Sequence, residues 1–292
     1  MKIVNILGGL GNQMFEYAMY LALKEAHPNE EVKVCTRSFG GYGLHNGLEI
    51  QRIFGVDLPE ASLWDLTRLA YPFFNYKTWQ VMRHKLPPRK SMTRGALGIP
   101  FDFGEVERQT STYYEGYWQN EKNFKHIREK VIGAYTFPVF EDEQNKELAS
   151  RLLSENAVSC HIRRGDYLKE PAWGVCKEAY YFRAITRAVE EQGAKLICVF
   201  SDDIPWCREH LEGAFAGVEK VYVDWNKGEN SFRDMHLMTL CRHNIIANSS
   251  FSWWGAWLGQ QPDKVVYAPK IWVNGNVKND PICYNWIRLE TN

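Results

Sequence analysis

The sequence predicts an α/β protein with parallel β-sheets, and two observations support this fold class. From about residue 140 onward, short β-rich segments alternate with helical segments, which is the pattern of a parallel sheet covered by helices on both faces. The chain also opens with an extended apolar segment, a glycine turn and a helical segment. At 292 residues it has room for about two domains. We place their boundary at residue 140, giving domains 1–140 and 141–292.

The first domain begins with a βα unit. Residues 2–7 predict a strand, the glycine run after it a turn, and residues 12–26 a helix whose apolar side chains share one face. The aromatic segment 63–82 predicts another helix. The stretches 39–60 and 84–112 are rich in glycine, proline and polar residues and predict no regular element.

The glycine turn has two interpretations. It supplies only the first two glycines of the GxGxxG dinucleotide fingerprint, because Met14 stands at the position of the third. The glycines serve a tight turn that needs permissive dihedral angles, or they let the backbone at Gly11 approach a phosphate or sugar beside a helix N-terminus. In the second case Asn12 and Gln13 carry the first side chains to reach the ligand.

The second domain alternates helices and strands regularly. The expected helices span residues 141–156, 178–192, 205–211, 232–241 and 252–258. The expected strands span residues 157–162, 195–200, 220–223, 244–247 and 264–268. The first four strands each lead into a polar cluster, at residues 161–167, 201–203, 224–225 and 248–255. Because ligands bind at the carboxyl ends of parallel strands, these clusters predict a binding site at one edge of the sheet.

Two arginines follow the first of these strands. Charged side chains at this place need a negative partner, which is either a ligand or an acid such as Asp166. A guanidinium can hold a pyrophosphate through two parallel hydrogen bonds. Because side chains alternate along an extended chain, at most one of Arg163 and Arg164 faces the ligand. His161 either orients a neighbouring group or fills the end of the strand.

The later clusters also have two interpretations each. Asp203, followed by Pro205, predicts the start of a helix. As ligand-binding residues, Asp202 and Asp203 would instead hold the base or the ribose of a nucleotide. The run NSSFSWWGAWL at 248–258 opens a helix whose free N–H groups and hydroxyls suit an anion, and its aromatic residues pack that helix.

Composition and missing motifs weigh against several functions. The formal net charge is zero, with 35 basic and 35 acidic residues, so the chain lacks the basic excess that nucleic-acid binding requires. We interpret the basic cluster between Arg83 and Arg94 as a solvated linker, with an anion-attracting rim as the alternative. The sequence contains no DxD, HExxH, GKS, GKT or GxSxG motif, which disfavours a transferase that holds Mg²⁺ or Mn²⁺ between paired acids.

The sequence also indicates a compartment. No segment approaches the ~18 apolar residues of a membrane span, and the apolar run at the N-terminus is too short for a signal peptide. The seven cysteines are odd in number and have no CxxC spacing, which is typical of buried thiols in a reducing compartment. We therefore expect a cytoplasmic protein. The 11 Trp and 15 Tyr residues fit either a large aromatic core or sugar binding.

Four motifs, taken together and in order, resemble those of the bacterial α-1,2-fucosyltransferase family. They are GGLGNQMF at 8–15, HIRRGDY at 161–167, SDD at 201–203 and NSSFSWWGAWL at 248–258. Glu16 stands where that family commonly has glutamine. The resemblance implies a fold of glycosyltransferase-B type, with two Rossmann-like domains whose parallel sheets face a cleft. It also implies GDP-β-L-fucose as donor, a galactose-terminated oligosaccharide accepting at its 2-hydroxyl, inversion at the anomeric carbon, and no metal or other cofactor.

The resemblance assigns roles to residues and domains. It places the acceptor on the first domain and the donor on the second, with Arg163 on the diphosphate and Asn12 near the donor phosphates. Inversion in one displacement needs a base, for which we name Asp166, although that acid would equally serve to orient an arginine. The catalytic residues expected are therefore Arg163, Asp166 and Asn12. The donor-binding residues expected are Gly11, Asn12, Gln13, His161, Arg163, Asp202, Asp203, Asn248, Ser249, Ser250, Phe251 and Ser252.

Two other functions stay open. One is a metal-independent nucleotide-sugar transferase with a different sugar or linkage. The other is a carbohydrate-binding module, which would use the aromatic residues but would leave the arginine motif without a purpose. A nicotinamide oxidoreductase is disfavoured because the dinucleotide fingerprint is incomplete.

Overall fold

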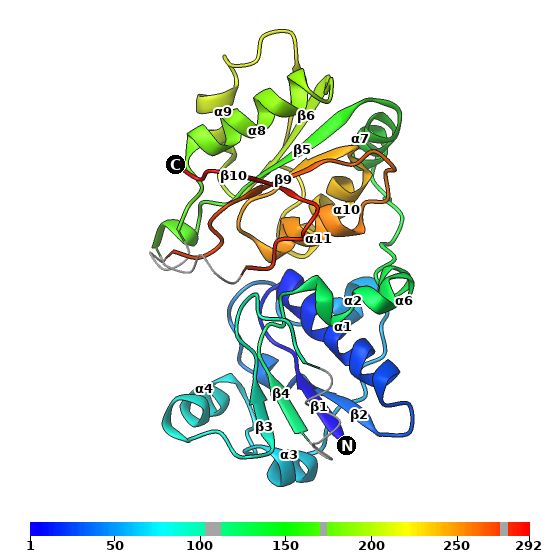
Figure 1. Ribbon diagram of the computed structural model, residues 1–292, viewed down its shortest axis with the longest axis vertical. Coiled ribbons are helices and arrows are strands. Elements are labelled where there is room, and N and C mark those ends of the chain that lie inside the picture. The colour runs from blue at the N-terminus through cyan, green and yellow to red at the C-terminus, as the bar shows by residue number, and fades with distance from the viewer. Residues whose placement is uncertain (103–111, 170–173, 275–279) are drawn as a thin grey trace. The chain divides into compact units, whose positions relative to one another are not determined.

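The computed structural model describes residues 1–102, 112–169, 174–274 and 280–292. The chain divides into two compact units, Met1–Pro138 and Val139–Asn292, and each unit has its own parallel sheet and helices (Figure 1). We refer to them as unit 1 and unit 2 and describe each by itself.

Unit 1 is built on a sheet of four strands in the order β2-β1-β4-β3, and every neighbouring pair is parallel. The strands are β1 (Lys2–Asn5), β2 (Val32–Cys35), β3 (Met92–Arg94) and β4 (Thr112–Glu115). The central strands β1 and β4 are buried along their whole length, as expected for a sheet that is covered on both faces.

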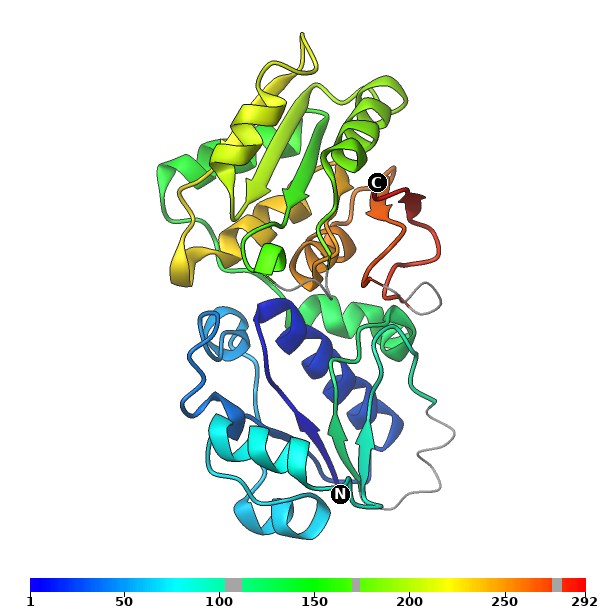
Figure 2. The ribbon, with the colours of Figure 1, turned by 90° about the vertical axis from the view of Figure 1, so that its left-hand side faces the viewer.

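The helices of unit 1 differ in part from the expectation. They are α1 (Leu10–Ala26), α2 (Ile50–Phe54), α3 (Leu63–Leu69), α4 (Tyr76–Lys85) and α6 (Arg128–Ala134). Short 3₁₀ turns span Arg37–Phe39, Glu121–Asn123 and Lys125–Ile127. Figure 2 shows the long helix α1 lying along the sheet, and this helix is almost entirely buried.

Two expectations for unit 1 were wrong. The single helix expected over residues 63–82 is two helices, because Pro72 interrupts the helical pattern and Asn75 caps a new helix with a capping box. The stretches 39–60 and 84–112, for which no regular element was expected, contain α2, the end of α4, β3 and the first residue of β4.

Unit 2 contains a sheet of six parallel strands in the order β10-β9-β8-β5-β6-β7. The strands are β5 (Ala157–Ile162), β6 (Leu196–Ser201), β7 (Glu219–Val223), β8 (His243–Ile245), β9 (Val266–Pro269) and β10 (Ile287–Leu289). The helices are α7 (Glu143–Ser154), α8 (Glu178–Glu190), α9 (Ile204–Leu211), α10 (Phe232–Leu240) and α11 (Ser250–Leu258). The five expected strands and five expected helices are therefore confirmed to within two residues at each end, and β10 is an addition.

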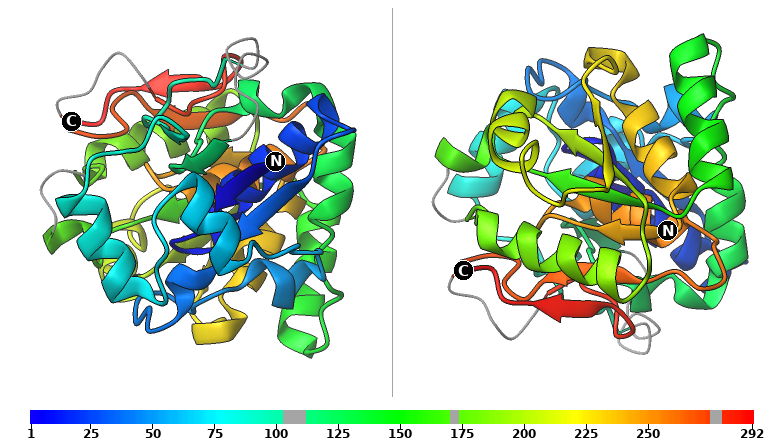
Figure 3. Two further views of the ribbon diagram at one scale, coloured as in Figure 1. Left: turned by 90° about the horizontal axis from the view of Figure 1, so that it is seen from below. Right: turned by 90° about the horizontal axis from the view of Figure 1, so that it is seen from above.

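Helices cover both faces of this second sheet (Figures 1 and 3). On one face, apolar residues of α8 and α9 pack against β5 and β6. On the other face, residues of α7 and α10 pack against β6 and β7. The seven cysteines are free and buried, as expected from their spacing. Because all the strands of this sheet run in one direction, their carboxyl ends lie along the same edge.

Candidate functional site

The sequence clusters after β5 and β6 come together at the carboxyl edge of unit 2. The two strands are neighbours, and their last residues, Ile162 and Ser201, lie opposite each other in the parallel register. The loop after β5 therefore runs beside the loop after β6. This places the arginine motif against the two aspartates, as the strand-end pattern predicted.

Arg163 lies between two carboxylates. One terminal nitrogen lies 2.7 Å from Oδ1 of Asp166, and the other lies 3.2 Å from Oδ2 of Asp202. The guanidinium also stands 5.4 Å from the centre of the Tyr167 ring. Burial opposes the positive charge, but the two acids outweigh it and raise the pKa of Arg163. Arg163 is therefore a fixed cation at the sheet edge.

Asp202 holds this arrangement through both of its oxygens. Its Oδ1 accepts a hydrogen bond of 2.9 Å from the backbone N–H of Arg164, while Oδ2 faces Arg163. Gly165 makes the approach possible, since a Cβ at that position would lie only 2.7 Å from Oδ2 of Asp202. Asp202 thus positions Arg163 and the loop that carries it.

Arg164 points to a different set of partners. Its Nε lies 3.1 Å from Oδ2 of Asp203, and its guanidinium stands 4.0 Å from the centre of the Trp206 ring. Asp203 also accepts a hydrogen bond of 3.3 Å from the backbone N–H of Trp206, so its role as cap of α9 is confirmed. The two arginines therefore diverge, and Arg163 is the one that lies between Asp166 and Asp202.

His161 is buried just before the arginines. Its ring lies 5.9 Å from that of Phe251, and Nδ1 has no hydrogen-bond partner in the part of the chain that the structure describes. Burial, together with the charge of Arg163, lowers the pKa of His161 to about 3. The imidazole is therefore neutral at physiological pH, and one of its nitrogens is open to a further partner.

The motif at 248–258 forms the start of α11 at the same edge. The side chain of Ser249 caps the helix by accepting from the backbone N–H of Phe251 at 3.3 Å, and Ser252 donates to the carbonyl of Ser249. The hydroxyl of Tyr167 donates to the carbonyl of Asn248 at 3.2 Å. The helix start is thereby linked to the arginine loop, and it also contains Ser250 as its first residue.

The side-chain amide of Asn248 binds other segments of unit 2. Its amide nitrogen donates to the carbonyls of Trp272 at 3.0 Å and Gly174 at 3.3 Å, and its Oδ1 faces the thiol of Cys176 at 3.6 Å. The residue is almost completely buried. Its amide holds the segments around the helix start in place.

The glycine turn lies in unit 1, where Gln13 holds it to a distant segment. The Gln13 amide is fully buried and makes four hydrogen bonds. It donates to the carbonyls of Gly8 and Gly47 at 2.8 and 2.7 Å, and accepts from the backbone N–H groups of Glu49 and Ile50 at 2.8 and 3.2 Å. An amide side chain has no further capacity for hydrogen bonds, so Gln13 shapes the turn.

The Asn12 side chain keeps part of its hydrogen-bonding capacity. Its Oδ1 accepts a hydrogen bond of 2.7 Å from Gln119, which fixes the direction of the amide. A Cβ at Gly8 would lie 2.9 Å from Nδ2 of Asn12, so glycine and its positive φ of 95° are needed there. The backbone of Gly11, in the first turn of α1, lies beside them. Among the residues that the structure describes, none accepts a hydrogen bond from Asn12 Nδ2, so this group can donate to a ligand.

Glu16 is buried below the turn and accepts a hydrogen bond of 2.7 Å from the backbone N–H of Leu7. Burial raises its pKa well above the usual value, although the hydrogen bond from Leu7 acts in the opposite direction. Its protonated form is therefore favoured. A protonated carboxyl combines an O–H donor with an acceptor oxygen, as an amide combines N–H donors with an acceptor oxygen, which explains why glutamate can replace glutamine here.

The sequence reasoning missed an acid in unit 2. Asp234, in the first turn of α10, accepts a hydrogen bond of 2.9 Å from Asn226, which also donates to Asn145 at 3.0 Å. Burial raises the pKa of Asp234 to about 8, against the effect of the Asn226 hydrogen bond. Asn226 follows β7 at the carboxyl edge, so the polar end of that strand was the available signal.

Two features are absent from the described residues. No group of three or more His, Cys, Asp or Glu side chains there is arranged to hold a metal ion. No helix in the described ranges is both long and apolar enough to cross a membrane.

Comparisons with known proteins agree with this arrangement. The family model for glycosyl transferase family 11 matches residues 96–290. An alpha-1,2-colitosyltransferase of Escherichia coli is 33% identical over 99% of this chain and 98% of its own length. The galactoside 2-alpha-L-fucosyltransferase SEC1 of Bos taurus is 27% identical over 87% of this chain, and the match spans 63% of that protein. A crystal structure of POFUT1 in complex with GDP has a TM-score of 0.50, with 13% identity, and covers 91% of this chain and 97% of its own.

The fold and the strand-end site define a glycosyltransferase with two parallel α/β units, the glycosyltransferase-B type of fold. The chain belongs to glycosyl transferase family 11. Both the fold class and the family resemblance drawn from the sequence are thereby confirmed.

Proposed function

We propose that the protein transfers L-fucose from GDP-β-L-fucose to the 2-hydroxyl of a terminal galactoside, with inversion and without a metal ion. The observation that carries this proposal is Arg163, a fixed cation at the carboxyl edge of unit 2. The relatives with fucosyltransferase and colitosyltransferase names support the reaction class. In the reaction the galactoside oxygen attacks the anomeric carbon of fucose, the bond from that carbon to the β-phosphate breaks, and GDP leaves.

The exposed fractions of Asp166 and Asp202 indicate which of these two acids a bound diphosphate would displace. The local cluster contains Arg163 and Arg164 against three aspartates, so an added diphosphate must displace one of the carboxylates. The Asp166 side chain is 53% exposed, whereas that of Asp202 is 25% exposed. Breaking the ion pair between Asp166 and Arg163 costs little free energy, because exposed ion pairs are weak. We assign the diphosphate to the side of Arg163 that Asp166 occupies in the ligand-free protein.

Further groups supplement Arg163 in stabilising the leaving diphosphate. The first N–H groups of α11, at Ser249 and Ser250, are natural anion donors because they lie at a helix N-terminus. Asn12 is a further proposed donor to the phosphates, as the family resemblance implies. Such prearranged donors stabilise charge that develops in the transition state. The proposal that no metal is needed rests on this set of donors.

The same displacement gives Asp166 its second role. Once a diphosphate replaces it at Arg163, its carboxylate is free to accept the proton of the attacking hydroxyl. Asp166 is therefore our proposed base. If Asp166 only orients Arg163, its removal will change donor binding and turnover together, without a change in the pH profile.

The partly buried acid Asp234 is our proposed partner for guanine. The base presents N–H donors at N1 and N2, and an ionised carboxylate can accept both. In the ligand-free protein the pKa of Asp234 is raised, which favours its protonated form. Hydrogen bonds from guanine would favour the ionised form and would therefore lower this pKa strongly. We also propose the cytoplasm as the compartment, because buried free cysteines are typical of a reducing environment.

A second donor has specific support. The relative matched over 98% of its length is a colitosyltransferase, and colitose is the 3-deoxy counterpart of fucose. The experiment is a turnover comparison of GDP-fucose and GDP-colitose with the same galactoside acceptor. A higher kcat/KM for GDP-fucose supports the proposal, and turnover of GDP-colitose alone replaces fucose by colitose. Failure of the protein to bind GDP would overturn the transferase proposal.

A further inference from the structure

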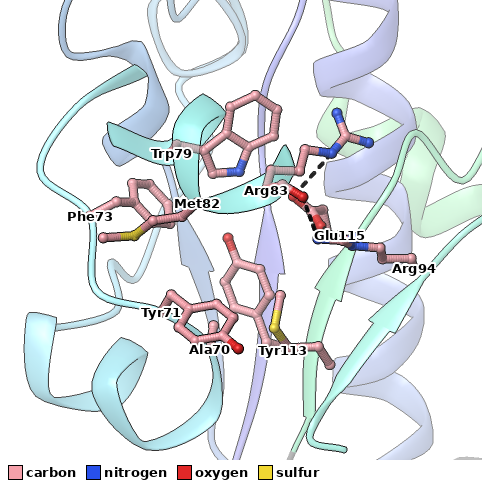
Figure 4. Close-up of a pocket in the computed structure, with 10 residues that line it drawn as sticks. Ala70, Tyr71, Phe73, Trp79, Met82, Arg83, Arg94, Tyr113 and Glu115 are labelled. Atoms are coloured by element: carbon pink, nitrogen blue, oxygen red, sulfur yellow. Dashed lines mark hydrogen bonds and ion pairs between the residues drawn. The ribbon is translucent and has the colours of Figure 1, made fainter. Parts of the chain in front are cut away.

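Unit 1 contains a pocket that the function described so far does not use. It lies between α4, the segment that leads into α4, and the strands β3 and β4 (Figure 4). Its enclosed part is small, and most of the space between its lining side chains is open to solvent. One wall is aromatic and the end toward the strand termini is charged. The lining aromatic residues are Tyr71, Phe73, Trp79 and Tyr113, and the charged ones are Arg83, Arg94 and Glu115.

The charged end is built around a buried carboxylate. Glu115 has a side chain only 4% exposed, and its Oε2 lies 2.7 Å from Nε of Arg94. Its other oxygen lies 3.5 Å from Nε of Arg83, which is longer than an ordinary hydrogen bond. Glu115 and Arg94 end two paired strands and lie opposite each other in the register. The group therefore sits at the carboxyl edge of the unit 1 sheet, where ligands of parallel sheets bind.

Arg83 has hydrogen-bonding capacity to spare. Its guanidinium lies 5.0 Å from the centre of the Trp79 ring, and its side chain is 41% exposed. Its two terminal nitrogens have no hydrogen-bond partner among the described residues. A hydroxyl placed between Arg83 and Glu115 could accept from the guanidinium and donate to the loosely held carboxylate oxygen.

Ring contacts connect the pocket to the glycine turn within the same unit. Trp79 stacks on Tyr76 at 5.7 Å between centroids, and Tyr76 meets Tyr42 edge-on at 5.0 Å. Tyr42 lies 6.3 Å from the ring of His45. A Cβ on Gly9 would lie 3.3 Å from that His45 ring, so His45 covers the turn. A ligand that reaches from the pocket along these rings ends beside the start of α1.

We propose that this pocket and its aromatic border bind a neutral pyranose ring of the oligosaccharide acceptor. This assignment rests on the proposed galactoside transfer and adds the residues that recognise the acceptor. A sugar has apolar faces that suit flat aromatic rings. Its hydroxyls both donate and accept, which matches a carboxylate beside a guanidinium. A phosphate has no donors for Glu115 and would be repelled by it, so the pocket disfavours the diphosphate part of the donor.

The test separates acceptor binding from donor chemistry. The variants are Glu115→Gln, which keeps the shape and loses the charge, and Arg83→Lys, which keeps the charge and loses the planar fork. For both we expect the acceptor KM to rise about 10-fold or more, which is the size of losing a charged hydrogen bond. The Kd for GDP and the slow hydrolysis of GDP-fucose in the absence of acceptor should stay within twofold of wild type.

Arg187→Ala is the matched control, because Arg187 forms an exposed ion pair with Glu191 in unit 2. An acceptor KM within twofold of wild type in both folded pocket variants overturns the assignment. If Glu115→Gln does not fold, the Arg83→Lys result decides. Absence of GDP-fucose turnover by wild type refutes the proposed donor and leaves the pocket testable. Saturation-transfer NMR of lactose then supports the pocket if the wild-type signal falls in the Arg83→Lys variant, and refutes it if lactose gives no signal or an equal one.

Discussion

The two sheet edges of this protein use different chemistry. In unit 2 the edge carries charged groups held in pairs, with Arg163 between Asp166 and Asp202. In unit 1 the edge carries a glycine turn, a border of aromatic rings, and the buried carboxylate of Glu115 beside Arg94 and Arg83. An arginine whose acidic partner is exposed suits the diphosphate of a donor, whereas a buried carboxylate and aromatic rings suit the neutral hydroxyls and flat faces of a sugar. Two units with related topology therefore divide the donor and acceptor roles between them in our proposal.

The largest expected effect is at the charged edge of unit 2. Arg163→Ala should lower kcat/KM for transfer by about 10³-fold, because it removes the principal charge opposite the leaving diphosphate. The fold should persist, since the side chain is partly exposed. Steady-state kinetics and circular dichroism measure the two effects, with Arg187→Ala as the control. A folded Arg163→Ala variant with nearly wild-type activity would refute the diphosphate assignment.

Removal of the competing acid should have two opposite effects. Asp166→Asn should lower kcat by about 10²-fold or more through loss of the base. It should also tighten GDP binding by up to about fivefold, because an exposed ion pair no longer competes for Arg163. Calorimetry with GDP and the pH profile of kcat test both effects. Weaker GDP binding, with an unchanged pH profile, would make Asp166 a positioning residue instead.

A substitution that only shifts the Asp202 side chain should lower activity less than the loss of Arg163 or Asp166. In Gly165→Ala the new methyl group would meet Oδ2 of Asp202 at 2.7 Å, so the carboxylate must shift away from Arg163. We expect a loss of about 10- to 100-fold in kcat/KM from this displacement. Gly213→Ala is the control in the same unit, because no atom lies within 4 Å of its added Cβ. Equal activity in the two variants would show that Asp202 does not position the arginine.

The smallest effect is expected below the turn in unit 1. Glu16→Gln should keep activity within about twofold, because the amide oxygen can accept the hydrogen bond from Leu7 as the carboxyl oxygen does. The wild-type pKa is raised, so the stability contributed by Glu16 is present at low pH and is lost as pH rises through the folded-state pKa. Thermal unfolding at several pH values should therefore show the variant gaining stability relative to wild type as the pH rises above the usual range of a carboxyl group. A Tm difference that does not vary with pH would mean that Glu16 is already ionised in the fold.

The sequence predicted the unit 2 edge well because its signals are local. Alternating helices and strands imply a parallel sheet, and a parallel sheet brings strand ends such as Arg163 and Asp202 to one edge. Asp203 could be recognised as a helix cap from Pro205 alone. The break between α3 and α4 also had a local signal in Pro72 and Asn75, and the aromatic pattern concealed it.

Other features depend on contacts between distant segments. Gln13 was expected to face the donor, but its amide is saturated by Gly8, Gly47, Glu49 and Ile50. The burial of Asp234 depends on neighbours such as Asn226 and Asn145. The strand that carries Glu115 follows a polar stretch and has no apolar run. None of these pairings leaves a periodic pattern, so they become visible only in the folded chain.

The central claim is tested most directly by wild-type protein with GDP-fucose and lactose in the presence of EDTA. The account predicts release of GDP together with a fucosyl-lactose whose NMR spectrum shows an α-linkage to the 2-hydroxyl of galactose. A product with a different linkage would contradict the acceptor assignment. Activity that appears only when a divalent metal is added back would contradict the proposal that Arg163 and the helix start alone stabilise the departing diphosphate.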